Sequence, residues 1–137
     1  MKTISFSPPD ITEAEIKEVA EALRSGWITT GPRTKKLEKE IANYCGTNKV
    51  VCLNSATASL ELNLRVLGIG PGDEVITSAY TYTASASVID HIGAKIVLID
   101  TAAGSYEMDY EKLESVITER TKAIIPVDLA GIPCNYS

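Results

Sequence analysis

Short apolar segments alternate with helical segments from residue 49 onward, and this alternation constrains the fold more than any other feature of the chain. The apolar segments lack the regular apolar–polar alternation of a strand with one wet face, so they are typical of strands buried on both sides. Such strands, separated by helices, form βαβ units around a parallel sheet. The sequence therefore predicts an α/β fold. The expected strands are 50–54, 73–78, 95–100 and 122–129, and the expected helices between them are 56–68, 81–93 and 109–118.

The first third of the chain has a different pattern. Apolar residues recur at helical spacing over residues 11–25, where Gly26 offers a stop, and a second, charged helix is expected over 34–45. No linker or internal repeat separates this part from the rest. We therefore interpret residues 1–137 as a single incomplete domain, with a helical segment at 1–47 followed by βα repeats at 48–137.

Composition excludes several classes of function. A net charge of −5 and a pI near 4.9 provide no basic surface for nucleic acid. No segment has the apolar core of a secretory signal or the length of a membrane span, which predicts a cytoplasmic protein that does not contact membranes. The three cysteines are widely spaced, so we expect reduced thiols and no metal site. They are Cys45, Cys52 and Cys134.

A strand-to-helix junction is the first candidate ligand site. It comprises Asn54, Ser55, Ala56 and Thr57. Small residues at the start of a helix leave backbone N–H groups open, hydroxyls add donors, and the helix dipole favours an anion, as in a phosphate cradle. The same residue types are also the ordinary N-caps of helices, and from these residues alone the cap is the commoner explanation.

Two further candidates lie at the carboxyl ends of expected strands, where ligands of open α/β sheets bind. Tyr82, in the segment Tyr80–Thr83, could stack on a planar ring, or the tyrosines could pack beneath a helix. Asp128 could bind a ligand or a catalytic neighbour, or it could cap the following turn. Both alternatives remain open for each position.

Four ordered segments give the chain a resemblance to a known family. They are GWITTGPRTKKLE (26–38), NSATASLELNL (54–64), GDEVITSAYTYTASASVI (72–89) and RTKAIIPVDLAGIP (120–133). Together they resemble the N-terminal part of the DegT/DnrJ/EryC1/StrS sugar aminotransferases, and within that family they are most similar to enzymes that make 4-amino sugars on UDP. The resemblance implies the aspartate-aminotransferase-like large domain of fold-type-I enzymes, with pyridoxal 5′-phosphate (PLP) as cofactor.

The resemblance also implies roles for matched positions. Ser55, Ala56 and Thr57 would contact the cofactor phosphate, and Tyr82 would stack on its pyridine ring. Thr29 and Thr30 would border the sugar-nucleotide pocket, whereas the role of Asp128 stays open because many members carry histidine there. The expected reaction moves an amino group from an amino acid such as glutamate to a UDP-linked 4-keto sugar in cell-surface polysaccharide biosynthesis, in a homodimer.

Two segments of the family pattern have no counterpart in these residues. They carry the Schiff-base lysine and the aspartate that pairs with the pyridine nitrogen. We therefore expect the isolated chain to have no catalytic residue of its own, to bind PLP weakly or not at all, to self-associate and to be inactive. Two alternatives are a non-catalytic binding or regulatory remnant and one part of a split enzyme that a second chain completes.

Overall fold

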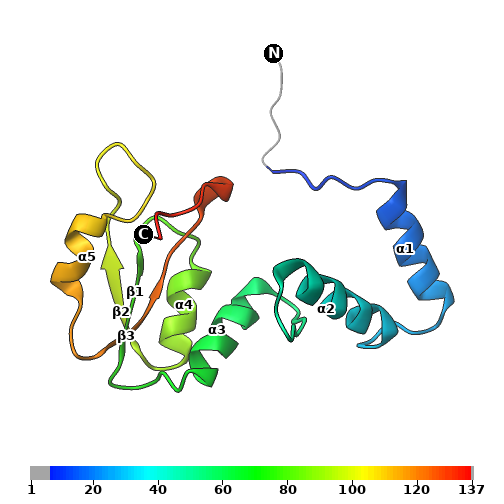
Figure 1. The fold of residues 1–137 in the computed structure, drawn as a ribbon, viewed down its shortest axis with the longest axis horizontal. Helices are drawn as coiled ribbons and strands as arrows, with labels where there is room; N and C mark the ends of the chain where they lie inside the picture. The colour runs from blue at the N-terminus through cyan, green and yellow to red at the C-terminus, as the bar shows by residue number, and fades with distance from the viewer. Residues whose placement is uncertain (1–6, 137) are drawn as a thin grey trace, which may run out of the picture. The chain divides into compact units, whose positions relative to one another are not determined.

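The computed structural model describes residues 7–136. They divide into two compact units after Cys52. The first unit holds two helices, and the second holds a sheet with helices on both faces (Figure 1). Whether both units belong to one incomplete domain stays a prediction.

Capping residues and other local signals mark the ends of both helices of the first unit. Helix α1, Glu13–Arg24, starts with a capping box in which Thr12 and Glu15 exchange hydrogen bonds. Helix α2, Pro32–Cys45, has proline in its first turn and ends at Gly46, whose φ of 65° is the left-handed conformation that glycine adopts at helix ends. The helices predicted at 11–25 and 34–45 are thus confirmed.

Three parallel strands form the sheet of the second unit. They are β1 (Glu74–Ser78), β2 (Lys95–Ile99) and β3 (Thr121–Ile125), in the order β2-β1-β3. Both neighbours pair with β1 in parallel register, which confirms the predicted α/β class. The strand predicted at 122–129 ends earlier than expected because Pro126 follows Ile125, and proline has no N–H to donate to a ladder.

The strand predicted at 50–54 is wrong. These residues have no regular secondary structure, and no strand in the described part of the chain pairs with them. The Cys52 N–H donates instead to the Glu38 carboxylate at 2.9 Å. An apolar segment becomes a strand only where another strand supplies its hydrogen bonds, so its composition was insufficient evidence.

The helices of the second unit cover opposite faces of the sheet (Figure 1). Helices α3 (Ala56–Val66) and α4 (Ala84–His91) pack over a core that includes Val75 and Ile96, whereas α5 (Tyr110–Val116) packs over Ile76 and its neighbours. Successive strand residues therefore point into different cores, as the pleat requires. A short 3-10 helix, η1 (Leu129–Gly131), follows β3.

The connections orient α3 and α4 alike. Each leads through a short turn into the amino end of a strand, α3 into β1 and α4 into β2 (Figure 1). Their C-terminal halves also touch, because His91 Nδ1 lies 3.0 Å from Glu61 Oε2 and Arg65 donates to the His91 carbonyl at 3.2 Å. The N-terminal ends of both helices therefore face the carboxyl edge of the sheet.

Candidate functional site

The start of α3 combines a satisfied cap with unused donors. Ser55 is the N-cap, and its Oγ accepts a hydrogen bond from the Ala58 N–H at 3.1 Å. Within the described residues, the N–H groups of Ala56 and Thr57 and the Thr57 hydroxyl have no partner. The first turn of a helix presents such N–H groups outward and carries a partial positive charge. The junction is therefore an N-cap that keeps donors free for an anion.

Tyr82 lies in the loop between β1 and α4, at the carboxyl edge that α3 also faces. Tyr82 is 82% exposed, and its one hydrogen bond in the described residues is accepted by its backbone carbonyl from the Ser85 N–H at 3.0 Å. Burial beneath a helix, one of the two alternatives for this segment, does not occur at Tyr82. The ring is available to a planar ligand.

Tyr80, two residues earlier, is already occupied. Its ring stacks on that of Tyr106, with centroids 5.5 Å apart and planes inclined by 25°. Tyr106 belongs to the loop after β2 and is not among the candidate residues that the sequence motifs indicate. The signal that could have indicated it is its place in the loop that follows the carboxyl end of a strand, because such loops border the ligand edge of the sheet.

Asp128 follows β3 at the same edge and holds the end of the described chain. Its Oδ1 accepts hydrogen bonds from the Cys134 N–H at 2.9 Å and the Tyr136 hydroxyl at 2.8 Å. These bonds lower the pKa of Asp128, with the Cys134 N–H as the larger cause, and the carboxylate in turn raises the pKa of Tyr136. The Asp128 side chain does not cap η1. Its hydrogen bonds reach residues further along the chain than the turn cap considered above would.

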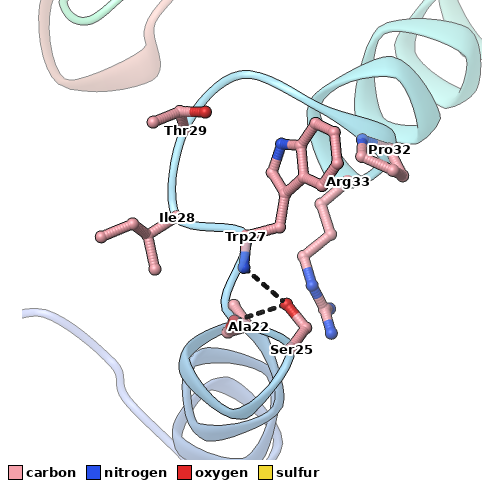
Figure 2. A pocket seen from close by; sticks show the side chains of 7 residues that line it. All are labelled: Ala22, Ser25, Trp27, Ile28, Thr29, Pro32 and Arg33. Carbon is pink, nitrogen blue, oxygen red and sulfur yellow. Dashed lines mark hydrogen bonds between the residues drawn. The ribbon is translucent and has the colours of Figure 1, made fainter.

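Thr29 and Thr30 lie in the first unit, in the loop between α1 and α2. Trp27 anchors this loop, because its Nε1–H donates to the Thr30 carbonyl at 3.1 Å and its ring lies against Gly31. Figure 2 shows the indole within the curve of the loop, beside Pro32 and Arg33. Thr29, but not Thr30, lines a pocket of about 550 Å³ here. The other lining residues are Ala22, Ser25, Trp27, Ile28, Pro32 and Arg33.

Arg33 is committed to ion pairs at the rim of this pocket. Its guanidinium pairs with Glu18, and it lies 4.0 Å from Glu21, both on α1. Ser25 Oγ accepts from the Trp27 N–H at 3.2 Å and donates to the Ala22 carbonyl at 2.6 Å. The pocket therefore offers an exposed indole face and the Thr29 hydroxyl, while its charged group is already neutralised.

Metal clusters, disulfides and membrane-spanning helices do not occur within residues 7–136. No group of three potential metal ligands occurs there, and the three cysteines have free thiols. None of the helices in that range has the length and apolar content needed to cross a membrane.

Comparisons with known proteins agree on one family. The sequence model of the DegT/DnrJ/EryC1/StrS aminotransferase family matches residues 9–137. The chain is 50% identical over 123 residues to the UDP-4-amino-4-deoxy-L-arabinose–oxoglutarate aminotransferase of Shewanella sediminis, covering 90% of this chain and 32% of that protein. It is 45% identical over 132 residues to the spore coat polysaccharide biosynthesis protein SpsC of Bacillus subtilis, covering 96% and 34%.

Solved structures give the same result. Spr1654 of Streptococcus pneumoniae, named as a sugar aminotransferase, superposes with a TM-score of 0.92 at 66% identity in both its PMP and PLP forms. The match covers 98% of this chain and 34% of that one. The chain thus spans about a third of the length of the relatives it matches.

Proposed function

Because the chain belongs to the DegT/DnrJ/EryC1/StrS aminotransferase family, we propose that it forms the part of a PLP-dependent sugar aminotransferase that grips the cofactor phosphate and ring. The whole protein would transfer an amino group from an amino acid such as glutamate to a UDP-linked 4-keto sugar. The name of the Shewanella relative supports a nucleotide sugar as the substrate. The name of the Bacillus relative supports a role in polysaccharide biosynthesis.

The donors at the start of α3 fit the cofactor phosphate. Two N–H groups and the Thr57 hydroxyl, all without a partner in residues 7–136, lie at the positive end of the helix dipole, and this combination favours a phosphate dianion. Thr57 would donate a third hydrogen bond beside those of its own N–H and the Ala56 N–H. Ser55 would keep its capping role and hold the turn in place.

The Tyr82 ring fits the cofactor ring. It is exposed at the edge that the start of α3 faces, and an aromatic face without a partner gains contact area by stacking on a pyridine. When bound, PLP supplies the electron-withdrawing ring that makes amino transfer possible. The joint placement of free phosphate donors and a free aromatic ring at one edge is the observation that carries the proposal.

The lysines of the second unit do not complete such a site. Lys95 and Lys122 lie near the amino ends of their strands, where Lys95 binds Glu74 and Lys122 donates to the Glu119 carbonyl. Lys112 is on α5, across the sheet from α3, and pairs with Asp109. We therefore propose that the 137-residue chain by itself binds the cofactor but does not catalyse amino transfer.

Binding of pyridoxamine 5′-phosphate (PMP) to the 137-residue chain tests this function, because PMP needs no lysine to be held. We expect weak but saturable binding, the weaker-affinity outcome of the two expected from the sequence, that inorganic phosphate competes away. Thr57→Val should weaken PMP and phosphate alike, by about tenfold for one hydrogen bond to a charged group, and Tyr82→Ala should weaken PMP alone. Tyr44→Ala, at an exposed position on α2, is the matched control. Absence of saturable binding would refute the proposal.

Amino transfer is a separate measurement. The purified chain should not transfer an amino group from glutamate to a UDP-linked 4-keto sugar when PLP is supplied. Turnover by this chain alone would contradict the proposal that it binds the cofactor but does not catalyse amino transfer. Turnover only after a second polypeptide is added would instead identify one part of a split enzyme.

For the sugar nucleotide, we propose the pocket beside Trp27. An exposed indole and the Thr29 hydroxyl are groups that could contact a base and a polar sugar. Trp27 is the only tryptophan, so its fluorescence reports on this pocket without interference. UDP should quench it saturably, and Thr29→Ala should weaken the effect more than Thr30→Ala, since Thr30 does not line the pocket. Equal effects of the two variants would count against this assignment.

We also propose that the chain self-associates, as a homodimer in the whole protein. Helix α1 exposes an apolar face in which Ile16, Val19 and Leu23 are each more than half exposed, and no residue of α1 or α2 is buried within its unit. Exposed apolar faces of this kind favour association. Sedimentation should detect species larger than 14.7 kDa, and a stable monomer at all concentrations would contradict self-association.

A further inference from the structure

The stacked rings of Tyr80 and Tyr106 join two loops at the carboxyl edge of the sheet. Tyr80 belongs to the β1–α4 loop that also carries Tyr82, and Tyr106 belongs to the β2–α5 loop. Neither ring fills a core, since Tyr80 is 52% and Tyr106 is 64% exposed. Their stack is therefore a contact between loops, and its consequence depends on how firmly each loop is held.

The loop that carries Tyr106 is braced. Thr101 and Met108 form an antiparallel bridge, and the Ala102 N–H donates to the Glu107 carbonyl at 3.0 Å. Met108 is 3% exposed and packs in the core beneath α5. A hairpin-like loop that is closed at its base by the bridge to buried Met108 gives Tyr106 a defined position.

The loop that carries Tyr82 is held on both sides of that residue. Before it, the Ala79 N–H donates to the Ile99 carbonyl at 2.7 Å, and the Tyr80 N–H donates to Ser78 Oγ at 3.2 Å. The Thr81 hydroxyl is hydrogen-bonded to that of Ser85 at 2.8 Å. Among Tyr80, Thr81 and Tyr82, the Tyr82 side chain alone has neither a hydrogen bond nor a ring stack in the described residues, so its direction depends on how its neighbours are fixed.

We propose that Tyr106 is a positioning residue that, through its stack on Tyr80, holds the β1–α4 loop in the conformation that presents the Tyr82 ring to the cofactor. Tyr106 itself touches no cofactor in this arrangement. The ligand part of the inference rests on the proposed function. The mechanical part, that Tyr106 restrains the loop, stands on the stack and the bracing alone.

The mechanical part is tested without any ligand by amide hydrogen exchange. In Tyr106→Ala, exchange at Ala79 and Tyr80 should accelerate about 3- to 10-fold, the factor that loss of one aromatic pair contributes to local opening. Amides of β3 should be unchanged. Tyr106→Phe keeps the ring and should behave as wild type, and Tyr44→Ala is the control for loss of an exposed tyrosine. Unchanged exchange at Ala79 and Tyr80 in Tyr106→Ala overturns the inference.

The ligand part is tested with PMP and inorganic phosphate. Tyr106→Ala should weaken PMP binding about 3- to 10-fold and reduce the circular dichroism induced in the PMP absorption band, which reports on ring orientation, while phosphate affinity stays unchanged. In Tyr82→Ala, adding Tyr106→Ala should cause no further loss, because the ring being positioned is gone. Tyr106→Phe should restore wild-type behaviour.

The outcomes separate the two proposals. If Tyr82→Ala weakens PMP and Tyr106→Ala does not, the positioning role is refuted while the proposed function stands. If the wild-type chain binds no PMP, the proposed function fails and so does the ligand part, and the exchange measurement still decides whether Tyr106 holds the loop. A loss of both PMP and phosphate affinity in Tyr106→Ala would show general damage to the fold and refute a ring-specific role.

Discussion

The Glu74 carboxylate accepts a hydrogen bond from the Thr118 hydroxyl at 2.7 Å and so joins the start of β1 to the turn before β3. Lys95 and Arg120 donate to its other oxygen at 3.0 and 2.9 Å. Glu74 is 2% exposed. The bonds from Thr118 and Lys95 and the charge of Arg120 hold the pKa of Glu74 at about 2, although burial by itself would raise it.

Acid should therefore destabilise the second unit through Glu74. Its folded pKa lies below the ordinary value of 4.5, so the unfolded chain binds the proton more tightly, and the stabilisation is complete above about pH 4.5. It should be lost progressively as the pH falls toward about 2. Urea unfolding at several pH values measures this slope. Glu74→Gln should flatten it, whereas Glu114→Gln, at an exposed position on α5, should not, and parallel curves for all three proteins would contradict the prediction.

Gly31→Ala should disturb the Trp27 loop. A Cβ at residue 31 would overlap Trp27 Nε1, and the φ of −174° is ordinary extended backbone, so the cost is a clash with the ring and not backbone strain. The indole must leave its hydrogen bond to Thr30. We expect a shift of the tryptophan emission and weaker UDP quenching. Gly70→Ala, whose added Cβ would meet its nearest atom at 3.7 Å, should leave the emission unchanged.

Asp128→Asn should loosen the loop at 129–136. The neutral amide is a weaker acceptor for the Cys134 N–H and the Tyr136 hydroxyl than the carboxylate is. The pKa of Tyr136 should fall toward its ordinary value, which a spectroscopic titration of tyrosine shows by difference against Tyr136→Phe. Limited proteolysis should cut the loop several-fold faster. Asp90→Asn, on the exposed side of α4, is the control, and an unchanged Tyr136 titration in Asp128→Asn would refute this clamp.

Substitutions at Ser55 and Thr57 should have different effects on the stability of the fold. Ser55→Ala removes the acceptor for the Ala58 N–H and should lower the free energy of unfolding by about 1 kcal/mol, as for other helix caps. Thr57→Val removes a hydroxyl with no partner in the described residues and should change stability by less than about 0.5 kcal/mol. Urea midpoints measure both. A larger loss for Thr57→Val than for Ser55→Ala would show that Thr57 is structural.

Local patterns predicted the helices well. The apolar spacing at 11–25 and 34–45 predicted α1 and α2, and the structure adds the capping box of α1 and the early proline and terminal glycine of α2, which also act within a few residues. Because these signals are local, the sequence predicts Ser55 both as a helix N-cap and as part of a phosphate-binding site. Its side chain caps, and the N–H groups beside it remain free, so the two readings are compatible.

Contacts between segments distant in the sequence could not be predicted from those local patterns. The apolar segment 50–54 reads as a strand but has no partner strand in residues 7–136, and Tyr80 looks as available as Tyr82 until Tyr106 is seen stacked on it. Asp128 could be assigned neither to a turn nor to a ligand, because its two partners come from residues further along the chain. In each case the deciding atom belongs to another segment.

The sequence by itself determined the α/β class, the presence of the helices and the family, because periodicity and ordered motifs are properties of neighbouring residues. Tertiary structure alone decided the strand order β2-β1-β3, the burial of Glu74 among its cations and the availability of Tyr82 beside an occupied Tyr80. These depend on hydrogen bonds and stacking between segments that only folding brings together, and no local pattern specifies which segments meet.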